Sequence, residues 1–285
     1  MLGTPLEPSQ ISPVELEKIV RLALKEDIGE GDVTTNCTVP SDIVLSGRLI
    51  VKTKGVIAGL RVAKLAFLLL DGRIEFISNI KDGEFVKEGQ VIATIRGPGR
   101  AILTGERVAL NFLQRMSGIA SLTHEFVDAV RETSAVILDT RKTAPGLRIL
   151  DKWAVSLGGG HNHRLGLYDI VLIKENHIVA AGSISEALRR VRAGNIKGLP
   201  VEVEVKTLNE LKEALTLGVD RILLDNMGLD EMVKAVQIAD GLVPLEASGN
   251  IKLNNVQKIA MTEISYISVG MLTHSSKALD ISLLL

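Results

Sequence analysis

The chain has 285 residues, of which 46% are hydrophobic, and its formal net charge at pH 7 is −1. This length allows one large domain or two smaller ones with a sizeable core. The near-zero charge excludes a general electrostatic attraction to nucleic acid or to an anionic membrane, so any anion site must be built locally. The single cysteine, Cys37, excludes an internal disulfide, and we expect it to be a partly buried structural residue.

The amino-terminal region carries no pattern typical of a targeting signal or a membrane anchor. Residues 1–15 lack a basic stretch followed by an apolar one, so they do not predict a signal peptide. The longest apolar run, residues 60–72, contains Arg61, Lys64 and Asp71 and is too short and too charged to span a bilayer. We therefore expect a cytoplasmic protein without membrane contacts.

The first expected element is a helix near the amino terminus. Ser12 is a favourable N-cap, Pro13 suits the first helical position, and Glu15 would complete a capping box. Gly97–Arg100, with the sequence Gly-Pro-Gly-Arg, predicts a loop and a hinge between domains. Short strands and one buried helix are expected between these two points, at residues 47–55, 60–70, 73–79 and 84–97.

The pattern changes after residue 100. A long helical stretch begins near Thr104 and passes Thr133, with an expected break at Ser117–Gly118. Apolar strands and amphipathic helices then alternate. The expected strands are residues 135–140, 169–174, 201–206, 221–226, 242–249 and 266–270. The helices between them include residues 183–194, 208–218 and 228–240.

Alternating strands and helices imply a parallel sheet, which forms either an open sheet or a barrel. Polar residues stand at the carboxyl end of every expected strand, whereas an open sheet concentrates its site at one switch point. We therefore predict an α/β protein, with an incomplete β/α barrel as carboxy-terminal domain and an α+β sandwich as amino-terminal domain. The expected domains are residues 1–104 and 105–275, and the tail 276–285 is expected to pack back onto the first.

One side of the expected barrel mouth is cationic and the other is acidic. Several cations that face one cavity need an anionic ligand, and arginine side chains bind carboxylates or phosphates. Glycine-containing turns at residues 248–250 and 269–271 favour a phosphate at the last two strand ends. Glu204 and Asp225 can hold ribose hydroxyls or Mg²⁺. The cationic residues are Arg141, Lys142, His163, Arg164 and Lys174. These residues alone predict a site for a phosphorylated sugar and a small polycarboxylate.

Some nearby residues have simpler interpretations. His161 and His163 form an H-x-H pair, but no later strand end offers a third histidine, so zinc is not favoured. Glu202 alternates with valines, and its role is left open between structure and the site. For Asp139 the simpler interpretation is that it orients Arg141 or Lys142 and has no other role. Gly158–Gly160 follows a helix, so it lacks the context of a dinucleotide-binding turn.

The same residues carry a resemblance to a known family, quinolinate phosphoribosyltransferase, over nearly the whole chain. The block at residues 139–177 is long and specific, and the loop 26–35 fits the same family. The other similar stretches are residues 104–121, 201–205, 223–226, 246–251 and 267–275.

The resemblance implies that quinolinate and 5-phosphoribosyl-1-diphosphate give nicotinate mononucleotide, diphosphate and CO₂ in NAD biosynthesis, with Mg²⁺. The residues that match quinolinate-binding positions are Arg107, Arg141, His163, Arg164 and Lys174. Those around the ribose, diphosphate and metal are Lys142, Glu204 and Asp225. Those near the 5′-phosphate are Ser248, Gly249, Asn250, Gly270 and Met271, and Thr140 and Val269 complete the substrate-binding set. Catalytic roles are expected for Lys142, Lys174, Glu204 and Asp225, and Mg²⁺ at Glu204 and Asp225.

The family also implies a homodimer with shared active sites, in which Arg107 reaches into the neighbouring subunit's site. A higher oligomer such as a hexamer stays open. Gly105 stands where the family commonly has alanine, and this departure affects no catalytic position.

Three other functions remain open. A molybdate-linked relative shares the fold and many motifs, and an assay with quinolinate separates the two. Lys174 lies where Schiff-base lysines of aldolases work, although the neighbouring arginines favour anion binding. Residues 80–97 resemble the hairpins of biotinyl and lipoyl carrier domains, with Lys52 and Lys54 as candidate modification sites, but the helix expected at 60–70 interrupts that pattern.

Overall fold

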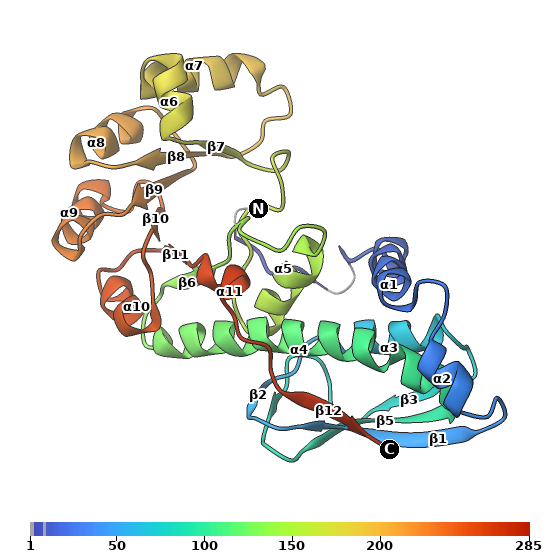
Figure 1. Cartoon of the computed structure of the whole chain (residues 1–285). Helices are drawn as coiled ribbons and strands as arrows, with labels where there is room; N and C mark the ends of the chain where they lie inside the picture. The colour runs from blue at the N-terminus through green and yellow to red at the C-terminus, as the bar shows by residue number, and fades with distance from the viewer. Residues whose placement is uncertain (1–2, 8–9) are drawn as a thin grey trace. The chain divides into compact units, whose positions relative to one another are not determined.

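The computed structural model of the chain describes residues 3–7 and 10–285 (Figure 1). It divides into two compact units, each assembled from separated parts of the sequence. The barrel unit comprises Met1–Pro5, Glu125–Thr143 and Gly160–His274. The sheet unit comprises Leu6–His124, Ala144–Gly159 and Ser275–Leu285. The domain limits expected between residues 104 and 105 stay a prediction.

The sheet unit contains a four-stranded antiparallel sheet in the order β12–β1–β5–β3. The Phe67 ring lies 6.2 Å from the ring of Phe76, so a helix covers one face of this sheet. The predicted α+β class of the amino-terminal domain is confirmed. The strands are β1 (Val44–Val51), β2 (Gly55–Val56), β3 (Glu75–Ser78), β4 (Phe85–Val86), β5 (Val91–Pro98) and β12 (Ile281–Leu284). The helices are α1 (Pro13–Ile28), α2 (Val33–Thr38), α3 (Leu60–Leu68), α5 (Arg148–Leu157) and most of α4 (Gly99–Ala129).

The carboxy-terminal strand β12 completes this sheet at its edge. It pairs antiparallel with β1, and Ile281 lies opposite Val51. Gln114 of α4 binds the backbone of β12 and of the segment just before it. Its side-chain amide donates to the Ile281 carbonyl at 2.7 Å, and its own carbonyl accepts from the Leu279 N–H at 3.0 Å.

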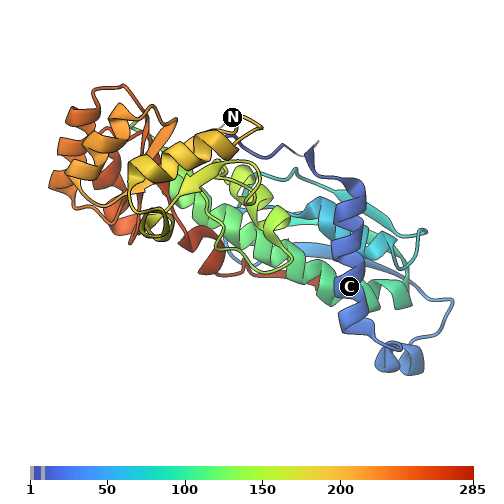
Figure 2. The same cartoon turned by 90° about the horizontal axis from the view of Figure 1, so that it is seen from above.

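The barrel unit contains a six-stranded parallel sheet in the order β6–β11–β10–β9–β8–β7. Figures 1 and 2 show the helices that follow these strands along the outer side of the sheet. Because β6 and β7 form its two ends, the predicted incomplete β/α barrel is confirmed. The strands are β6 (Val136–Leu138), β7 (Val171–Ile173), β8 (Val201–Val205), β9 (Arg221–Asp225), β10 (Leu245–Ser248) and β11 (Tyr266–Ser268). The helices are α6 (Glu175–Ala181), α7 (Ile184–Gly194), α8 (Leu208–Thr216), α9 (Leu229–Ala239), α10 (Leu253–Ala260) and α11 (Met271–His274).

Two predictions about the segment between residues 97 and 118 were wrong, for related reasons. The expected loop at Gly97–Arg100 is instead the end of β5 running directly into α4. A Cβ on Gly99 would lie 3.0 Å from the Leu45 side chain, so this glycine serves close packing. The expected break at Ser117–Gly118 lies inside a continuous helix. There Ser117 accepts the Ala58 N–H at 3.0 Å, and the backbone of Lys277 occupies the space of a Gly118 side chain.

Two further local predictions were wrong. Ser12 precedes α1 as expected, but its side chain makes no capping hydrogen bond, so the capping box is absent. Cys37 is exposed in α2 rather than partly buried.

Trp153, which we expected in the core, is 2% exposed. Within the residues described here, no helix is long and apolar enough to cross a membrane.

Candidate active site

The carboxyl edge of the barrel sheet gathers the residues that the sequence singled out. Because the six strands are parallel, their carboxyl ends meet at the same edge. A bridge between His161 and Leu138 brings the loop with His163 and Arg164 to this edge beside β6. The last expected residue, Arg107, belongs to α4 in the sheet unit. Residues within or directly after the strand ends are Thr140, Arg141, Lys142, Lys174, Glu204, Asp225, Ser248, Gly249, Asn250, Val269, Gly270 and Met271.

Two arginines form the cationic centre of this edge. Arg164 is 7% exposed, and burial followed by the positive charge of Arg141 lowers the pKa of its guanidinium group. Its Nη1 donates to the Ile170 carbonyl at 3.2 Å, which holds one side of the group. The Nε of Arg141 is buried and has no hydrogen-bond partner within the described part of the chain. A bound anion would neutralise the repulsion between these two cations and accept a hydrogen bond from the buried donor.

The loop with Arg164 is anchored to the end of β6. Asp139, fully buried, accepts the His163 N–H at 2.8 Å and the side-chain amide of Asn162 at 2.6 Å. Further along, the Asp169 carboxylate accepts the backbone N–H groups of Leu165 and Gly166. Carboxylates therefore hold the backbone on both sides of Arg164, so the side chain extends from a fixed backbone position.

The ends of β7 and β8 are joined by two ion pairs. Lys174 Nζ lies 3.2 Å from Glu204 Oε2, and Lys206 Nζ lies 2.6 Å from Glu175 Oε2. The hydrogen bond to Glu175 raises the pKa of Lys206, and the charges of Asp225 and Glu204 act in the same direction. Cationic and acidic groups therefore meet at the border between the two predicted halves of the site.

Glu204 and Asp225 fit a magnesium ion by their chemistry. They come from the ends of neighbouring strands, where Val205 pairs in register with Leu224. Mg²⁺ usually takes one or two protein carboxylates and completes its shell with water and substrate phosphates. Asp225 Oδ1 accepts a hydrogen bond from Asn226 Nδ2 at 3.0 Å, which orients one of the two carboxylates.

The turns after β10 and β11 are closely packed around glycines. Gly249 has a φ of 97°, and a Cβ there would overlap the Asn226 side-chain amide, so only glycine fits. Asn250 Nδ2 donates to the Asn226 side-chain oxygen at 3.0 Å and ties this turn to the end of β9. Gly270 allows the Lys142 side chain to approach, since a Cβ there would lie 3.1 Å from Lys142 Cδ. Both glycines therefore allow a neighbouring side chain to pack against the turn, and the phosphate expected at these turns stays a prediction.

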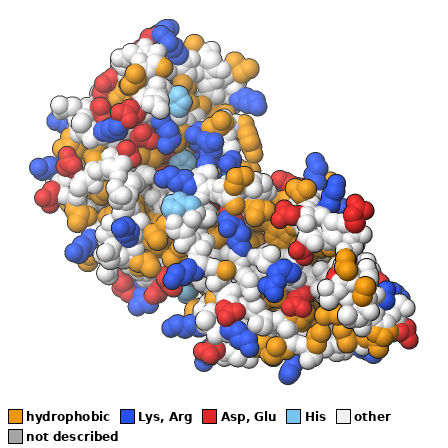
Figure 3. Space-filling view, in the orientation of Figure 1, with side chains coloured by type: hydrophobic (Ala, Val, Ile, Leu, Met, Phe, Trp, Pro, Cys, Tyr) orange, Lys and Arg blue, Asp and Glu red, His pale blue; other side chains and the backbone are white. Residues whose placement is uncertain are grey.

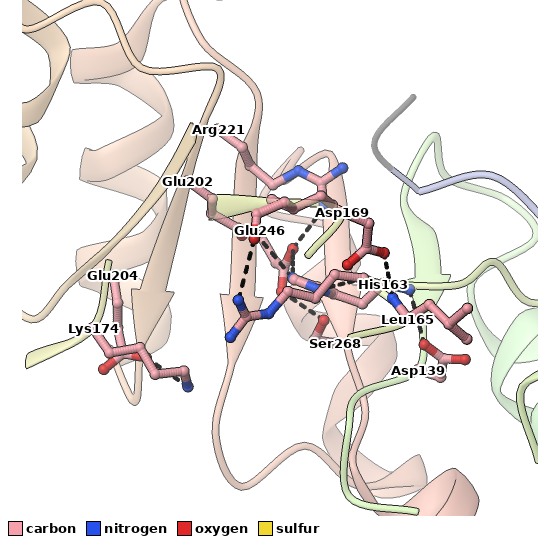
Figure 4. A network of polar contacts seen from close by, with 12 residues as sticks. Asp139, His163, Leu165, Asp169, Lys174, Glu202, Glu204, Arg221, Glu246 and Ser268 are labelled. Atoms are coloured by element: carbon pink, nitrogen blue, oxygen red, sulfur yellow. Dashed lines mark hydrogen bonds and ion pairs between the residues drawn. The ribbon is translucent and has the colours of Figure 1, made fainter. Parts of the chain in front are cut away.

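A buried polar network lies within the barrel beneath these residues (Figure 4). His163 Nε2 is 3.0 Å from Glu202 Oε2 and 3.5 Å from Glu246 Oε2. Arg221 Nη1 donates to Glu246 at 2.9 Å, and Ser268 Oγ donates to Glu246 at 2.6 Å. Burial and then the charge of Glu202 raise the pKa of Glu246 to about 7. Burial raises the pKa of Glu202, but its contacts with His163 outweigh this and lower it.

Sequence reasoning missed Glu246, Arg221 and Ser268 and left Glu202 open. The available signal was a charged residue inside a strand that is otherwise apolar, as in Arg221 at the start of β9. His163, Glu202 and Glu246 form the group in the described chain whose ligand atoms lie close enough to hold a metal. The Arg221 guanidinium already occupies the cationic position beside Glu246, so we interpret the group as an ion-pair network.

The surface of the barrel unit reflects this distribution of charge. In the space-filling view, Lys and Arg side chains lie next to histidines on the face of this unit that the picture shows (Figure 3). Because the overall charge of the chain is only −1, this gathering is a local feature.

Comparison with known proteins agrees with the residues described above. The family model "Quinolinate phosphoribosyl transferase, C-terminal domain" matches residues 119–284, and the model of the N-terminal domain matches residues 32–117. A Bacillus subtilis protein named probable nicotinate-nucleotide pyrophosphorylase [carboxylating] is 42% identical over 95% of this chain and 93% of its own length. A chloroplastic rice protein with the same enzyme name is 44% identical over 98% of this chain and 80% of its own.

Solved structures show the same likeness. NadC from Streptococcus pyogenes has a TM-score of 0.93 and 40% identity, covering 96% of this chain and 97% of its own. A nicotinate-nucleotide pyrophosphorylase from Francisella tularensis has a TM-score of 0.92 and 39% identity, covering 96% of each chain. Since both family models together span most of the sequence, the chain belongs to the quinolinate phosphoribosyltransferase family.

Proposed function

We propose that the chain transfers the phosphoribosyl group of 5-phosphoribosyl-1-diphosphate to quinolinate, with loss of CO₂, and so forms nicotinate mononucleotide for NAD biosynthesis. The observation that carries this proposal is the pair Arg141 and Arg164, whose guanidinium groups repel each other while Arg141 Nε stays buried without a partner in the described chain. A planar dicarboxylate neutralises both cations and accepts from their free donors. The relatives' enzyme name supports the same reaction.

The first step joins the pyridine nitrogen to the ribose. The nitrogen of quinolinate forms a bond to the anomeric carbon while the bond from that carbon to diphosphate breaks. Positive charge develops on the ribosyl centre, and Glu204 and Asp225 at the ends of β8 and β9 can stabilise it. Lys142, whose side chain packs against the turn at Gly270, can neutralise the departing diphosphate.

The second step removes the carboxylate next to the nitrogen. Its bond to the ring carbon breaks, CO₂ leaves, and the electron pair stays on that carbon until a proton from water replaces the carboxylate. The adjacent quaternary nitrogen stabilises the carbanion, and the cations Arg141, Arg164 and Lys174 add to this effect. In the free protein Lys174 is bound to Glu204, so substrate must share or replace that ion pair.

Mg²⁺ is part of this proposal. Glu204 and Asp225 would hold it together with the diphosphate oxygens, where it would neutralise the leaving group. We further propose that the enzyme acts in the cytoplasm as a homodimer or a larger homo-oligomer, with Arg107 of one subunit completing the neighbouring site.

The direct test uses purified protein with quinolinate, 5-phosphoribosyl-1-diphosphate and Mg²⁺. We expect nicotinate mononucleotide and CO₂ in equal amounts, and no product when EDTA removes the metal. Nicotinate in place of quinolinate is the matched control, because it lacks the second carboxylate. Absence of product from quinolinate would reject the function and leave the molybdate-linked relative, whereas a borohydride-trapped adduct at Lys174 would favour the aldolase.

A further inference from the structure

His163 has polar neighbours at both of its ring nitrogens. Its side chain is buried, and both ring nitrogens face protein groups. Nδ1 accepts the backbone N–H of Arg164 at 2.7 Å. Nε2 points the other way, into the buried network, at 3.0 Å from Glu202. Turning the ring over would place a carbon opposite each of these groups, so the two contacts together define its orientation.

These contacts also define the proton on the ring. A backbone N–H can only donate, so Nδ1 must be the acceptor and carries no hydrogen. Nε2 lies 3.0 Å from Glu202 and 3.5 Å from Glu246, and the negative charge of these groups favours a proton on this nitrogen. Burial lowers the pKa of His163, and the charges of Glu246 and Glu202 outweigh it and raise the pKa. The Arg164 N–H opposes a second proton, because a protonated Nδ1 would face another donor.

We propose that His163 is a positioning residue, which fixes the backbone of Arg164 instead of donating a ring hydrogen bond to the dicarboxylate. This inference rests on the proposed function, in which Arg164 binds quinolinate. The Arg164 N–H is bound to the ring, the His163 N–H to Asp139, and the guanidinium to the Ile170 carbonyl. These contacts hold the guanidinium of Arg164 where the positive charge of Arg141 acts on it.

The buried network supplies the other end of this support. Glu246 is held by Arg221 at 2.9 Å and by Ser268 at 2.6 Å, and Arg221 itself stacks over the Tyr266 ring at 4.0 Å. Glu202 and Glu246 are both fully buried, so loss of His163 would leave negative charge less compensated in the interior of the barrel. The imidazole of His163 therefore links the buried carboxylates of the barrel interior to the backbone of Arg164.

The first test measures the ring itself, in the wild-type protein. In ¹⁵N-histidine NMR spectra, His163 should show one protonated nitrogen, Nε2, and one unprotonated nitrogen, Nδ1. The signal is assigned by its loss in His163→Asn, with the exposed His124→Asn as matched control. Saturation with quinolinate should leave the protonation of both nitrogens unchanged. A doubly protonated ring in the free protein, or a proton gained on adding quinolinate, would overturn the proposal.

The second test separates positioning from direct contact by kinetics. His163→Ala removes the acceptor for the Arg164 N–H and should raise the KM for quinolinate at least about tenfold, the order expected for a misplaced charge-assisted hydrogen bond. His163→Asn retains an acceptor where Nδ1 stood and should recover much of that loss. The KM for 5-phosphoribosyl-1-diphosphate should stay within about twofold in both variants, since its sites lie on other strand ends.

The outcomes are distinguishable from failure of the proposed function. If Asn and Ala raise the KM for quinolinate equally, the ring acts directly and positioning is rejected. If His163→Ala does not fold, the NMR result alone decides. If the wild-type protein does not turn over quinolinate, the proposed function fails while the proton position in the free protein still answers the structural question.

Discussion

At the scale of single residues, the site combines cations that lack partners with cations that are already paired. Arg141 has an unpartnered buried Nε in the described chain, whereas Lys174 is bound to Glu204. An incoming dicarboxylate therefore gains new hydrogen bonds from Arg141 and only exchanges partners at Lys174. We expect the arginines to contribute more to quinolinate affinity than the lysine does.

Arg141→Ala should raise the KM for quinolinate at least about tenfold, because a charge-assisted and bidentate contact is lost. The KM for 5-phosphoribosyl-1-diphosphate should change little. Arg190→Ala is the matched control, since Arg190 lies on the outer helix α7 and pairs only with Glu186 among the contacts described. Steady-state kinetics with each substrate varied in turn measures the effect. Normal quinolinate affinity in Arg141→Ala would contradict the assignment.

The buried Glu246 should make stability depend on pH. Its pKa is raised from 4.5 to about 7, so the folded state holds the proton more tightly than the unfolded state. This contribution to stability is complete below the unfolded pKa and is lost as the pH rises through the folded pKa. The free energy of unfolding of wild type minus that of Glu246→Gln should therefore fall between pH 4.5 and about 7. Urea denaturation at several pH values measures it, and parallel curves would contradict the assignment.

At the scale of elements, the long helix α4 organises the sheet unit through its small residues. Ser117 and Ser121 bind the backbone of Ala58 and Val56, and Gly118 lies against the backbone of Lys277. These positions look like helix breakers in the sequence because serine and glycine are weak helix formers. In the structure they let β2 and the carboxy-terminal segment approach the helix closely.

Gly118→Ala tests this role. The added Cβ would overlap the Lys277 carbonyl, so we expect a loss of about 1–3 kcal/mol in the free energy of unfolding. Gly194→Ala, at the end of α7, is the matched control because no atom lies within 4 Å of its added Cβ. We expect it to be neutral or to stabilise by up to about 1 kcal/mol. Equal effects at both positions would mean that Gly118 has no packing role.

At the scale of the whole molecule, the proposed dimer predicts that two impaired variants rescue each other, when they are assayed at quinolinate concentrations far below the KM of each variant. If Arg107 completes the partner's site, a mixed dimer of Arg107→Ala and Arg141→Ala has one intact site. After mixing and subunit exchange, activity should return to about a quarter of wild type, since half of the dimers are mixed and each has one of two sites intact. Each variant alone is the control. No recovery, despite mixed dimers detected by native mass spectrometry, would place Arg107 within its own subunit's site.

Much of the fold follows from the order of residues. The barrel strands were located because strands buried on both faces are continuous apolar runs, as in Arg221–Asp225, where hydrophobic residues separate two charged ends. The site was located because parallel strands deliver polar residues such as Glu204 and Asp225 to one edge. Those inferences depend on local periodicity, which a single sequence displays.

The tertiary structure decided which residues distant in the chain contact one another, and the local sequence pattern does not show such contacts. The predictions for Gly118 and Gly97–Arg100 were wrong because their neighbours, such as Lys277 and Leu45, are distant in the chain. In the sequence alone, a glycine needed for close packing cannot be distinguished from a glycine in a flexible loop. The same holds for Glu246, which meets His163 only after the strands assemble. The sequence by itself determined the alternation of elements, the cationic edge and the family. Only the folded chain decided which charges are paired, because pairing depends on distance in space.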